Sequence, residues 1–479
     1  MTAWPGGATR RCGGLLAWAV VALLLVRLAS LAMVPLMDTT EARYADIARR
    51  MVQGGDWITP WFTETVPFWG KPPLSFWATA LSFKLLGVNE FAARLPHLLL
   101  GVAVAALVWR HARRHSRRAA WHAMAWLGAS SLFLVASGAV MTDMALALGT
   151  TLVMVGFWKA FHGGDGRARM PWAMVLGAAI GLLAKGPVSV ILWGVPVVGW
   201  VLFGGHLVQA WRRIAWLRGA ALVLVVSLPW YAWAESRTPG FLEYFIVGEH
   251  WMRFVTPGWK GDLYGSAHIF PRGAIWLFAL GAVAPWPFLL PALFPARRPA
   301  ASAPAAFDPG ERRYLLLWAL TPCLFFTPAR NILWTYVLPG LPALALLAGR
   351  WSATRERQRW AEGVLTSGVV LSIVATLGLI FVAQTNGRFD RKSAKAIVAE
   401  YRERRQGGEP LYFLDRVPFS GSFYSDGQAR VLERLEALPG GGSALVVLAE
   451  KRLAGLPADE RRRLEPLARR GDQVLARWR

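Results

Sequence analysis

Residues 15–57 read LLAWAVVALLLVRLASLAMVPLMDTTEARYADIARRMVQGGDW, an apolar run that passes directly into a charged segment. The apolar part is long enough to cross a bilayer, which takes ~20 residues in a helix. The following part, residues 37–57, carries four acidic and three basic side chains. The stretch therefore predicts a membrane-spanning helix followed by an exposed segment that is rich in carboxylates.

The composition indicates a membrane protein with many spans. Of 479 residues, 55% are hydrophobic and 26 are tryptophan, which is too apolar for a soluble enzyme of this size. The net charge of +24 comes from arginines clustered between apolar runs, as in residues 110–118. Such clusters are typical of cytoplasmic loops, and they form no recognisable nucleic-acid-reading unit. We therefore expect contact with membrane lipids and no binding of nucleic acid.

About eleven apolar runs are long enough, or nearly long enough, to cross the bilayer. They lie at residues 14–36, 94–110, 119–138, 143–161, 171–186, 187–204, 219–234, 273–294, 314–327, 332–349 and 362–384. The segment 72–87 is shorter and contains Lys84. If it crossed the membrane, the arginine cluster at 110–118 would be external, so we interpret it as an interfacial helix.

The C-terminal part is predicted to be a separate external domain. An odd number of spans places the chain after residue 384 opposite a cytoplasmic N-terminus. The runs EPLYFLD and SALVVLAE resemble strands, whereas AKAIVAEYRERR and DERRRLEPLARR resemble helices. The sequence therefore predicts an all-α membrane part over residues 1–384, with a long first external loop at 37–93. A small α/β domain over residues 385–479 follows it.

Three carboxylates near the external ends of spans are candidate catalytic groups: Asp38, Glu41 and Asp143. Asp38 and Glu41 stand three residues apart, which also fits a capping box at the start of a helix, so capping and catalysis are equally open. Asp143 lies between two apolar runs, where a carboxylate is costly unless it is partnered or faces a polar cavity. Its alternative interpretation is a helix cap.

The helix expected after Asp38 is amphipathic. It carries Tyr44 on an apolar face and Arg43 on a polar face, and such a helix could lie flat in the headgroup layer. Both side chains are candidate substrate-binding groups.

Several external cations are candidate binding groups. Lys71 follows Gly70 in a turn that two prolines stiffen, although a lysine among interfacial aromatic residues also snorkels. Lys185 ends an apolar run, and snorkelling is the simpler interpretation of that residue alone. Arg330 lies in a tight connection between two spans, where a guanidinium suits a phosphate.

The loop FLEYFIVGEHWMRFVTPGWKGDLYG places Glu249, His250 and Arg253 within about one helical turn. A histidine beside a glutamate suits a metal-ligand pair or an acid–base pair. A single histidine with one acid is weak support for either, and a structural surface histidine is the simpler interpretation.

Four segments together resemble a known family: EARYADIARRMVQGGDWITPWF, PFWGKPPLSFW, GVNEFAARLP and KGP. They are similar to the integral-membrane glycosyltransferases related to protein O-mannosyltransferases and to the lipid A aminoarabinose transferase. The resemblance implies a GT-C fold in the bacterial inner membrane, catalysis at the periplasmic face and a polyprenyl-phosphate-linked sugar as donor. It assigns reaction-centre roles to Glu41, Asp38 and Asp143, donor phosphate to Lys71, and the family's loop histidine and arginine to His250 and Arg253.

Two residues depart from the family pattern. Thr40 stands where an aspartate usually precedes the glutamate, and Gly70 stands where the aminoarabinose transferases have an acid before the lysine. A divalent metal is possible in this family, but Gly70 removes the most obvious partner of His250. We therefore assign no metal ligand and no certain cofactor.

The predicted function is transfer of a monosaccharide from a polyprenyl phosphate to a lipid A, glycolipid, glycan or protein acceptor. No nucleotide-binding motif is visible, and an activated lipid-linked donor needs none. The alternative from another class is a transporter or flippase of lipid-linked sugars. Such proteins commonly carry repeated halves with broken helices, and the sequence shows no duplication of this kind.

Overall fold

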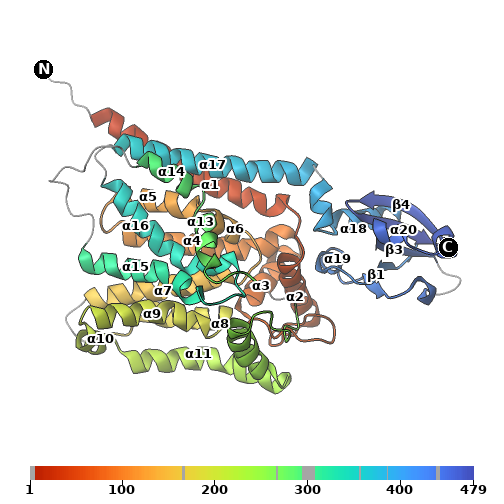
Figure 1. The fold of residues 1–479 in the computed structure, drawn as a ribbon, viewed down its shortest axis with the longest axis horizontal. Helices are drawn as coiled ribbons and strands as arrows, with labels where there is room; N and C mark the ends of the chain where they lie inside the picture. Colours follow the sequence, from red (N-terminus) through yellow and green to blue (C-terminus); the bar gives the residue numbers. More distant parts are fainter. Residues whose placement is uncertain are drawn as a thin grey trace.

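The computed structural model describes residues 6–163, 168–265, 268–293, 308–354, 358–385, 387–438 and 443–479. The chain folds into a long helical bundle with a small sheet domain attached to one end (Figure 1). The first turns of α1 lie at the opposite end of the bundle from this domain.

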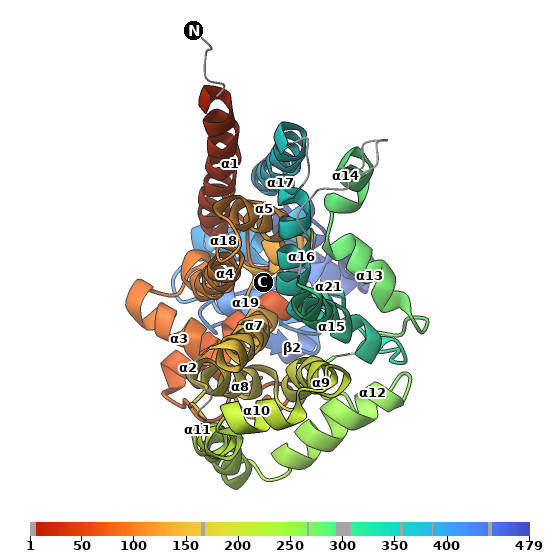
Figure 2. The same cartoon turned by 90° about the vertical axis from the view of Figure 1, so that its left-hand side faces the viewer.

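The helical part is that of a multi-pass membrane protein. Within the described residues, five helices are long and apolar enough to cross a membrane. They are α1 (Gly6–Met33), α4 (Glu90–Ala112), α7 (Asp143–His162), α11 (Trp216–Arg237) and α17 (Gln358–Thr385). A sixth span results if α13 (Ala274–Ala282) and α14 (Trp286–Leu293), which are bent by 72°, count as one. Seen along the bundle, α7 lies between α1 and α17 on one side and α11 on the other (Figure 2).

The other predicted runs are also helical, but they are shorter or interrupted. They form α5 (Arg117–Gly128), α6 (Ser131–Ala136), α8 (Trp172–Lys185), α9 (Val188–Phe203), α15 (Pro309–Phe326), η2 (Trp334–Gly340) and α16 (Leu341–Ala353). The number of about eleven crossings therefore stays a prediction. The segment expected at the interface forms α3 (Leu74–Leu86), an apolar helix below spanning length. The connections contain α10 (Leu207–Arg213), η1 (Glu243–Met252) and α12 (Arg253–Val255).

The C-terminal domain is a five-stranded mixed sheet with the strand order β2-β1-β3-β5-β4. The strands are β1 (Leu411–Leu414), β2 (Arg430–Leu432), β3 (Ala444–Ala449), β4 (Leu464–Arg470) and β5 (Gln473–Trp478). β1 runs parallel to β2 and β3, whereas β5 is antiparallel to β3 and β4. The helical elements are η3 (Gly387–Arg391), α18 (Lys395–Arg404), α19 (Phe419–Tyr424), η4 (Leu435–Ala437), α20 (Glu450–Ala454) and α21 (Ala458–Arg463).

The predictions for this domain are partly right. The strands β1 and β3 and the helix α18 are confirmed. The run DERRRLEPLARR was predicted as one helix, which is wrong, because α21 ends at Arg463 and the rest forms β4. Pro466 breaks the helix, and β4 lies at the edge of the sheet, where a proline costs no central ladder bond.

The first external helix, α2 (Thr40–Gly54), lies between the bundle and α19 (Figure 1). Its apolar face packs on α3, and its polar face is covered as well. Asp46 and Arg49 are buried and pair at 2.7 Å, and Ser422 of α19 accepts a 3.1 Å hydrogen bond from Arg50. The expectation that this helix lies flat in the headgroup layer is therefore wrong, since the C-terminal domain covers the face that would meet the headgroups.

Candidate functional site

A cavity of about 360 Å³ lies at the end of the bundle nearest to α2, between α8, α9, η1, α15 and η2. Its walls are largely apolar, with residues such as Val188, Ile191 and Phe325. The charged side chains among its lining residues are Lys71, Lys185, Glu249 and Arg253. The cavity is thus an apolar groove with a charged end, where three cations and one carboxylate belong to the lining.

Asp143 and Lys185 form an ion pair behind this cavity. Asp143 is the first residue of α7 and Lys185 is the last residue of α8. The Lys185 Nζ atom lies 2.5 Å from Asp143 Oδ1, and both side chains are 11% exposed. The ammonium group also lies over the Tyr336 ring, 4.8 Å from its centroid. Lys185 is therefore held inside the protein, and the snorkelling interpretation is wrong.

Glycines let α7 and α8 approach closely enough to make this pair. A Cβ atom at Gly149 would lie 2.7 Å from the carbonyl oxygen of Gly177, and one at Gly177 would lie 2.5 Å from that of Gly149. Small residues at a helix–helix contact allow such approach in membrane proteins. Gly186 ends α8 with a φ of 73°, and a Cβ atom there would meet the Phe245 ring at 2.6 Å. The KGP motif therefore ends α8 with its lysine facing Asp143 while η1 closes against the turn.

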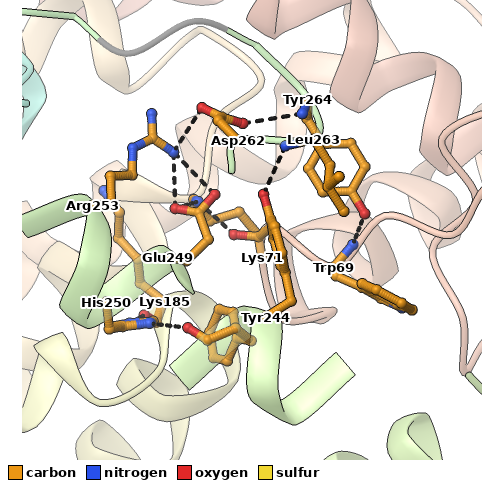
Figure 3. A network of polar contacts seen from close by, with 12 residues as sticks. Trp69, Lys71, Lys185, Tyr244, Glu249, His250, Arg253, Asp262, Leu263 and Tyr264 are labelled. Atoms are coloured by element: carbon orange, nitrogen blue, oxygen red, sulfur yellow. Dashed lines mark hydrogen bonds and ion pairs between the residues drawn. The ribbon is translucent and has the colours of Figure 1, made fainter. Parts of the chain in front are cut away.

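Glu249 joins two of the cavity cations (Figure 3). Its carboxylate accepts from Arg253 Nη1 at 2.8 and 3.0 Å and lies 3.6 Å from Lys71 Nζ. Burial alone would raise the pKa of Glu249, but the charges of Lys71 and Arg253 outweigh it and hold this pKa below the usual glutamate range. Burial lowers the pKa of Lys71, and the charge of Glu249 opposes that effect.

A second carboxylate, Asp262, lies 3.6 Å from Arg253 Nη1. The backbone of the same loop is tied to the first external loop, because Arg43 donates to the carbonyl oxygen of Tyr264 at 2.5 Å. The Tyr264 hydroxyl donates to the carbonyl oxygen of Pro67 and accepts from the Trp69 N–H (Figure 3). Burial raises the pKa of Tyr264 to about 12, so this hydroxyl stays protonated at neutral pH.

His250 is fixed by backbone on both sides of its ring. Nδ1 lies 2.7 Å from the carbonyl oxygen of Phe245, and Nε2 lies 3.1 Å from that of Lys185. Burial lowers the pKa of His250. The imidazole therefore links η1, a π-helix, to the end of α8. Such π-helical turns are frequent at functional sites.

The predicted site residues thus fall into two groups. Lys71, Lys185, His250 and Arg253 line the cavity, with Asp143 directly behind Lys185. Tyr44 is buried on α2, where the charges of Asp143, Glu249 and Lys185 act on it.

The other group has partners away from the cavity. Asp38 accepts hydrogen bonds from the N–H and the hydroxyl of Ser420 in the C-terminal domain, and it makes no helix cap, since Thr39 occupies the N-cap position of α2. Glu41 accepts two 2.8 Å bonds from Arg94. Arg330 Nε donates to the carbonyl oxygen of Phe270. The catalytic roles of Asp38 and Glu41 and the binding role of Arg330 stay predictions.

Sequence reasoning did not include three residues of the site among its candidate site residues. Glu249 was visible beside His250, but its two cationic partners come from distant segments. Asp262 and Tyr336 carry no local signal, because a single acid or tyrosine in a loop is ordinary. Only the fold brings these residues to Lys71, Arg253 and Lys185.

The family resemblance allows a divalent metal beside His250 and residue 70, but these two residues do not form a set of metal ligands. Gly70 supplies no carboxylate, and both ring nitrogens of His250 face carbonyl oxygens. A different cluster, His111, His115 and Glu311, has its ligand atoms within 4.8 Å of one another. Arg350 Nη1 already lies 2.5 Å from Glu311 and 3.2 Å from His115, so a guanidinium supplies the positive charge there.

Comparisons with known proteins agree with this architecture. Residues 13–245 match the family described as dolichyl-phosphate-mannose-protein mannosyltransferase. An undecaprenyl phosphate-alpha-4-amino-4-deoxy-L-arabinose arabinosyl transferase of Pseudomonas paraeruginosa is 32% identical over 75% of this chain and 65% of its own length. The protein of the same name from Shewanella sediminis is 29% identical over 70% of this chain and 59% of its own length. The chain thus spans about three fifths to two thirds of these curated relatives.

The fold has a close match among solved structures. The crystal structure of ArnT from Cupriavidus metallidurans bound to undecaprenyl phosphate gives a TM-score of 0.78, with 97% of this chain and 98% of that chain covered, at 22% identity. The apo structure of the same protein gives 0.75. The chain is therefore a member of the GT-C membrane proteins of the protein-mannosyltransferase and aminoarabinose-transferase type.

Proposed function

We propose that this protein transfers a sugar from a polyprenyl-phosphate donor to an acceptor in the bacterial envelope. The observation that carries the proposal is the cavity in which Lys71, Lys185 and Arg253 meet at the end of an apolar groove. A polyprenyl phosphate has the same two parts, an anionic head and a long apolar chain. The names of the relatives point to 4-amino-4-deoxy-L-arabinose on undecaprenyl phosphate as the donor. For the acceptor we propose lipid A, in line with the family resemblance of the first external loop.

In the proposed reaction, the acceptor oxygen attacks the anomeric carbon of the sugar. A carboxylate takes the acceptor proton, which is the work of a general base. Asp143 is our candidate, because it is paired at 2.5 Å with Lys185, which lines the cavity. The bond between the anomeric carbon and the phosphate oxygen breaks, and its electron pair stays on the phosphate. Lys71, Arg253 and Lys185 stabilise the charge that develops there.

Asp38 and Glu41 have a supporting role in this proposal. Glu41 fixes Arg94, and Arg94 also donates to the carbonyl oxygens of residues 31, 34 and 35, at the end of α1. Glu41 Oε1 also accepts from the N–H of Val140, in the segment that leads to Asp143. The acidic start of the external segment therefore positions the chain around the base.

The proposed location is the bacterial inner membrane, with the C-terminal domain in the periplasm. Glu90 at the start of α4 contacts Lys395 of that domain. The arginine cluster at 110–118 follows the other end of α4, so it lies on the opposite side of the bundle. This is the arrangement that the positive-inside rule predicts for a cytoplasmic N-terminus. A reporter enzyme that works only in the periplasm should be active when it is fused after Arg479. A reporter that works only in the cytoplasm should be inactive at the same position.

The test is a transfer assay with purified protein, undecaprenyl-phosphate aminoarabinose and lipid A, read by mass spectrometry of the lipid. The unchanged protein should add the sugar mass, and Asp143→Asn should transfer about 10²- to 10⁴-fold more slowly, the usual contribution of a general base. Glu243→Gln, an exposed carboxylate on η1, is the control and should keep full activity.

Two results would contradict parts of this proposal. Full activity of a folded Asp143→Asn protein would remove Asp143 as the base while leaving the transferase function. Binding of donor without any sugar transfer, across lipid, glycan and protein acceptors, would reject the transferase function and favour the transporter alternative.

A further inference from the structure

We propose that Glu249 acts as a specificity residue that prevents the site from retaining its phosphate product. This inference rests on the proposed function and concerns the ionic state of the phosphate that the cavity holds. The donor and the product occupy the same groove, so the site has to distinguish them by charge rather than by chain.

The reaction changes the charge of the phosphate. The donor is a phosphodiester with one negative charge. After the bond to the anomeric carbon breaks, the electron pair remains on the phosphate oxygen and the proton of the acceptor goes to the general base. The product is a phosphate monoester, whose second pKa near 6 gives it about −1.5 to −2 charges at neutral pH. Unopposed cations would therefore bind the product more tightly than the donor.

The charges at the site cancel before any ligand binds. Three cations are present, and each is within 4 Å of a carboxylate: Lys185 with Asp143, Lys71 with Glu249, and Arg253 with both Glu249 and Asp262. Three positive and three negative side chains therefore balance at the site, in two groups: the Lys185–Asp143 pair, and the contacts that join Lys71, Glu249, Arg253 and Asp262. A singly charged donor makes the site slightly negative, whereas a doubly charged product is repelled more strongly.

Glu249 holds a special position among these three carboxylates. It lines the cavity, and it contacts two of the three cations. Asp143, which pairs with Lys185, and Asp262, which lies 3.6 Å from Arg253, are not among the residues that line the cavity. The Glu249 side chain is only 8% exposed, so solvent and salt screen its charge weakly. A ligand phosphate that reaches Lys71 and Arg253 therefore meets the Glu249 charge at close range.

Gly70 lies directly beside this carboxylate. A Cβ atom at Gly70 would be 3.4 Å from Glu249 Oε1 and 2.9 Å from the Phe68 ring. A Cβ atom at residue 70 would therefore press against the Phe68 ring, whereas it would make an ordinary van der Waals contact with Glu249. The carboxylate beside Lys71 is therefore that of Glu249 on η1, since residue 70 is a glycine.

The experiment compares two ligands that differ in charge but share one chain. Undecaprenyl phosphate is the doubly charged ligand, and its methyl ester is the singly charged one. Their dissociation constants are measured by native mass spectrometry on the full-length protein, without turnover. The proteins are the unchanged chain, Glu249→Gln, Glu249→Asp and the control Glu243→Gln.

The expected result is a selective gain in affinity for the product. Glu249→Gln should bind undecaprenyl phosphate about tenfold more tightly or better, while its affinity for the methyl ester rises by a clearly smaller factor. Glu249→Asp keeps the charge and should restore the ratio of the two constants found in the unchanged protein. In the transfer assay, Glu249→Gln should show a fast first turnover followed by slow later turnovers, because product release limits the rate.

Equal changes for both ligands in Glu249→Gln, or no change for undecaprenyl phosphate, would overturn the inference. If Glu249→Gln does not fold, the unchanged protein decides: a much stronger affinity for the dianion than for the methyl ester would contradict the proposal, and similar affinities would support it. These binding results are independent of sugar transfer. Failure of transfer in the unchanged protein rejects the proposed function, whereas an unaltered ligand ratio rejects only the role of Glu249.

Discussion

At the scale of single residues, the site consists of buried ion pairs whose partners come from different segments. Lys71 belongs to the first external loop, and its partner Glu249 belongs to η1. Breaking a buried pair by removing one partner is costly, because it leaves an uncompensated charge. A substitution here therefore alters stability as well as binding, and each test needs a measurement that separates the two.

Replacing Lys71 by alanine should mainly weaken the use of donor. The side chain lies at the charged end of the groove, where we place the donor phosphate. We expect the apparent KM for donor to rise about tenfold or more, the scale of one lost charge-assisted hydrogen bond, with a smaller change in kcat. Steady-state transfer at varied donor concentration measures both. Lys260→Ala, an exposed lysine of the same external region, is the control, and an equal donor response in the two variants would argue against phosphate binding by Lys71.

The lowered pKa of Glu249 predicts a dependence of stability on pH. Because the folded state binds this proton less readily than the unfolded state, the pair stabilises the protein above the usual glutamate range. That contribution is lost as the pH falls through the lowered pKa. The thermal stability of the unchanged protein should therefore exceed that of Glu249→Gln at pH 7, and the difference should shrink as the pH falls below about 4.5, the usual glutamate range. A difference that stays constant down to pH 3 would show that the charge of Glu249 contributes nothing.

At the scale of elements, α7 and α8 pack with backbone against backbone at Gly149 and Gly177. α7 begins at the site with Asp143, and α8 ends there with Lys185. The close approach of the two helices at Gly149 and Gly177 determines how near these two residues lie. The contact that sets the positions of α7 and α8 thus also sets the distance between Asp143 and Lys185.

Gly177→Ala should separate the two helices. Its Cβ atom would lie 2.5 Å from the Gly149 oxygen and 2.8 Å from the Val153 nitrogen, both backbone atoms that cannot move alone. Overpacking of this kind costs about 1–3 kcal/mol, and transfer should fall as well because the Asp143–Lys185 pair is disturbed. Thermal unfolding and the transfer assay measure the two effects. Gly194→Ala on α9, where a Cβ atom meets nothing within 4 Å, should leave both unchanged.

The sequence predicted the elements best where hydrophobicity alone decides them. Within the described residues, the predicted apolar runs are mainly helical, some of them with interruptions, because a helix satisfies backbone hydrogen bonds within the membrane. The short strands β2, β4 and β5 were not predicted, since their residues carry no alternation strong enough to separate them from helix or loop. Among the residues that line the cavity, the sequence predicted Lys71, Lys185, His250 and Arg253 as candidate site residues, because they lie beside or between apolar runs. Glu249, Asp262 and Tyr336 were not, because their roles depend on contacts between segments far apart in the chain.

At the scale of the whole molecule, the C-terminal domain is attached to the bundle by polar contacts. Tyr424 accepts from the N–H of Leu36 at 2.7 Å and donates to Glu90 at 3.0 Å. Lys395 lies 2.5 Å from the same glutamate. The domain therefore covers α2 and the first external loop, and those in turn hold Lys71 and Tyr44.

Tyr424→Phe should loosen this attachment without unfolding the bundle. It removes two hydrogen bonds, one of them to a carboxylate, which together stabilise the interface by about 2–4 kcal/mol. Amide hydrogen exchange should become faster in α2 and α19 and stay unchanged in α7. Tyr412→Phe, within the sheet domain, is the matched control. Equal exchange in Tyr424→Phe and the unchanged protein would mean that the tyrosine hydroxyl does not hold the domain.

The glycine before Lys71 has a consequence for how related genes are recognised. In this chain the carboxylate next to that lysine comes from η1 rather than from the preceding residue. A search that requires an acid immediately before the lysine would discard this chain as degenerate. The feature to follow in this chain is the pairing between the lysine turn and the loop glutamate, because it places a carboxylate beside Lys71 although residue 70 is a glycine.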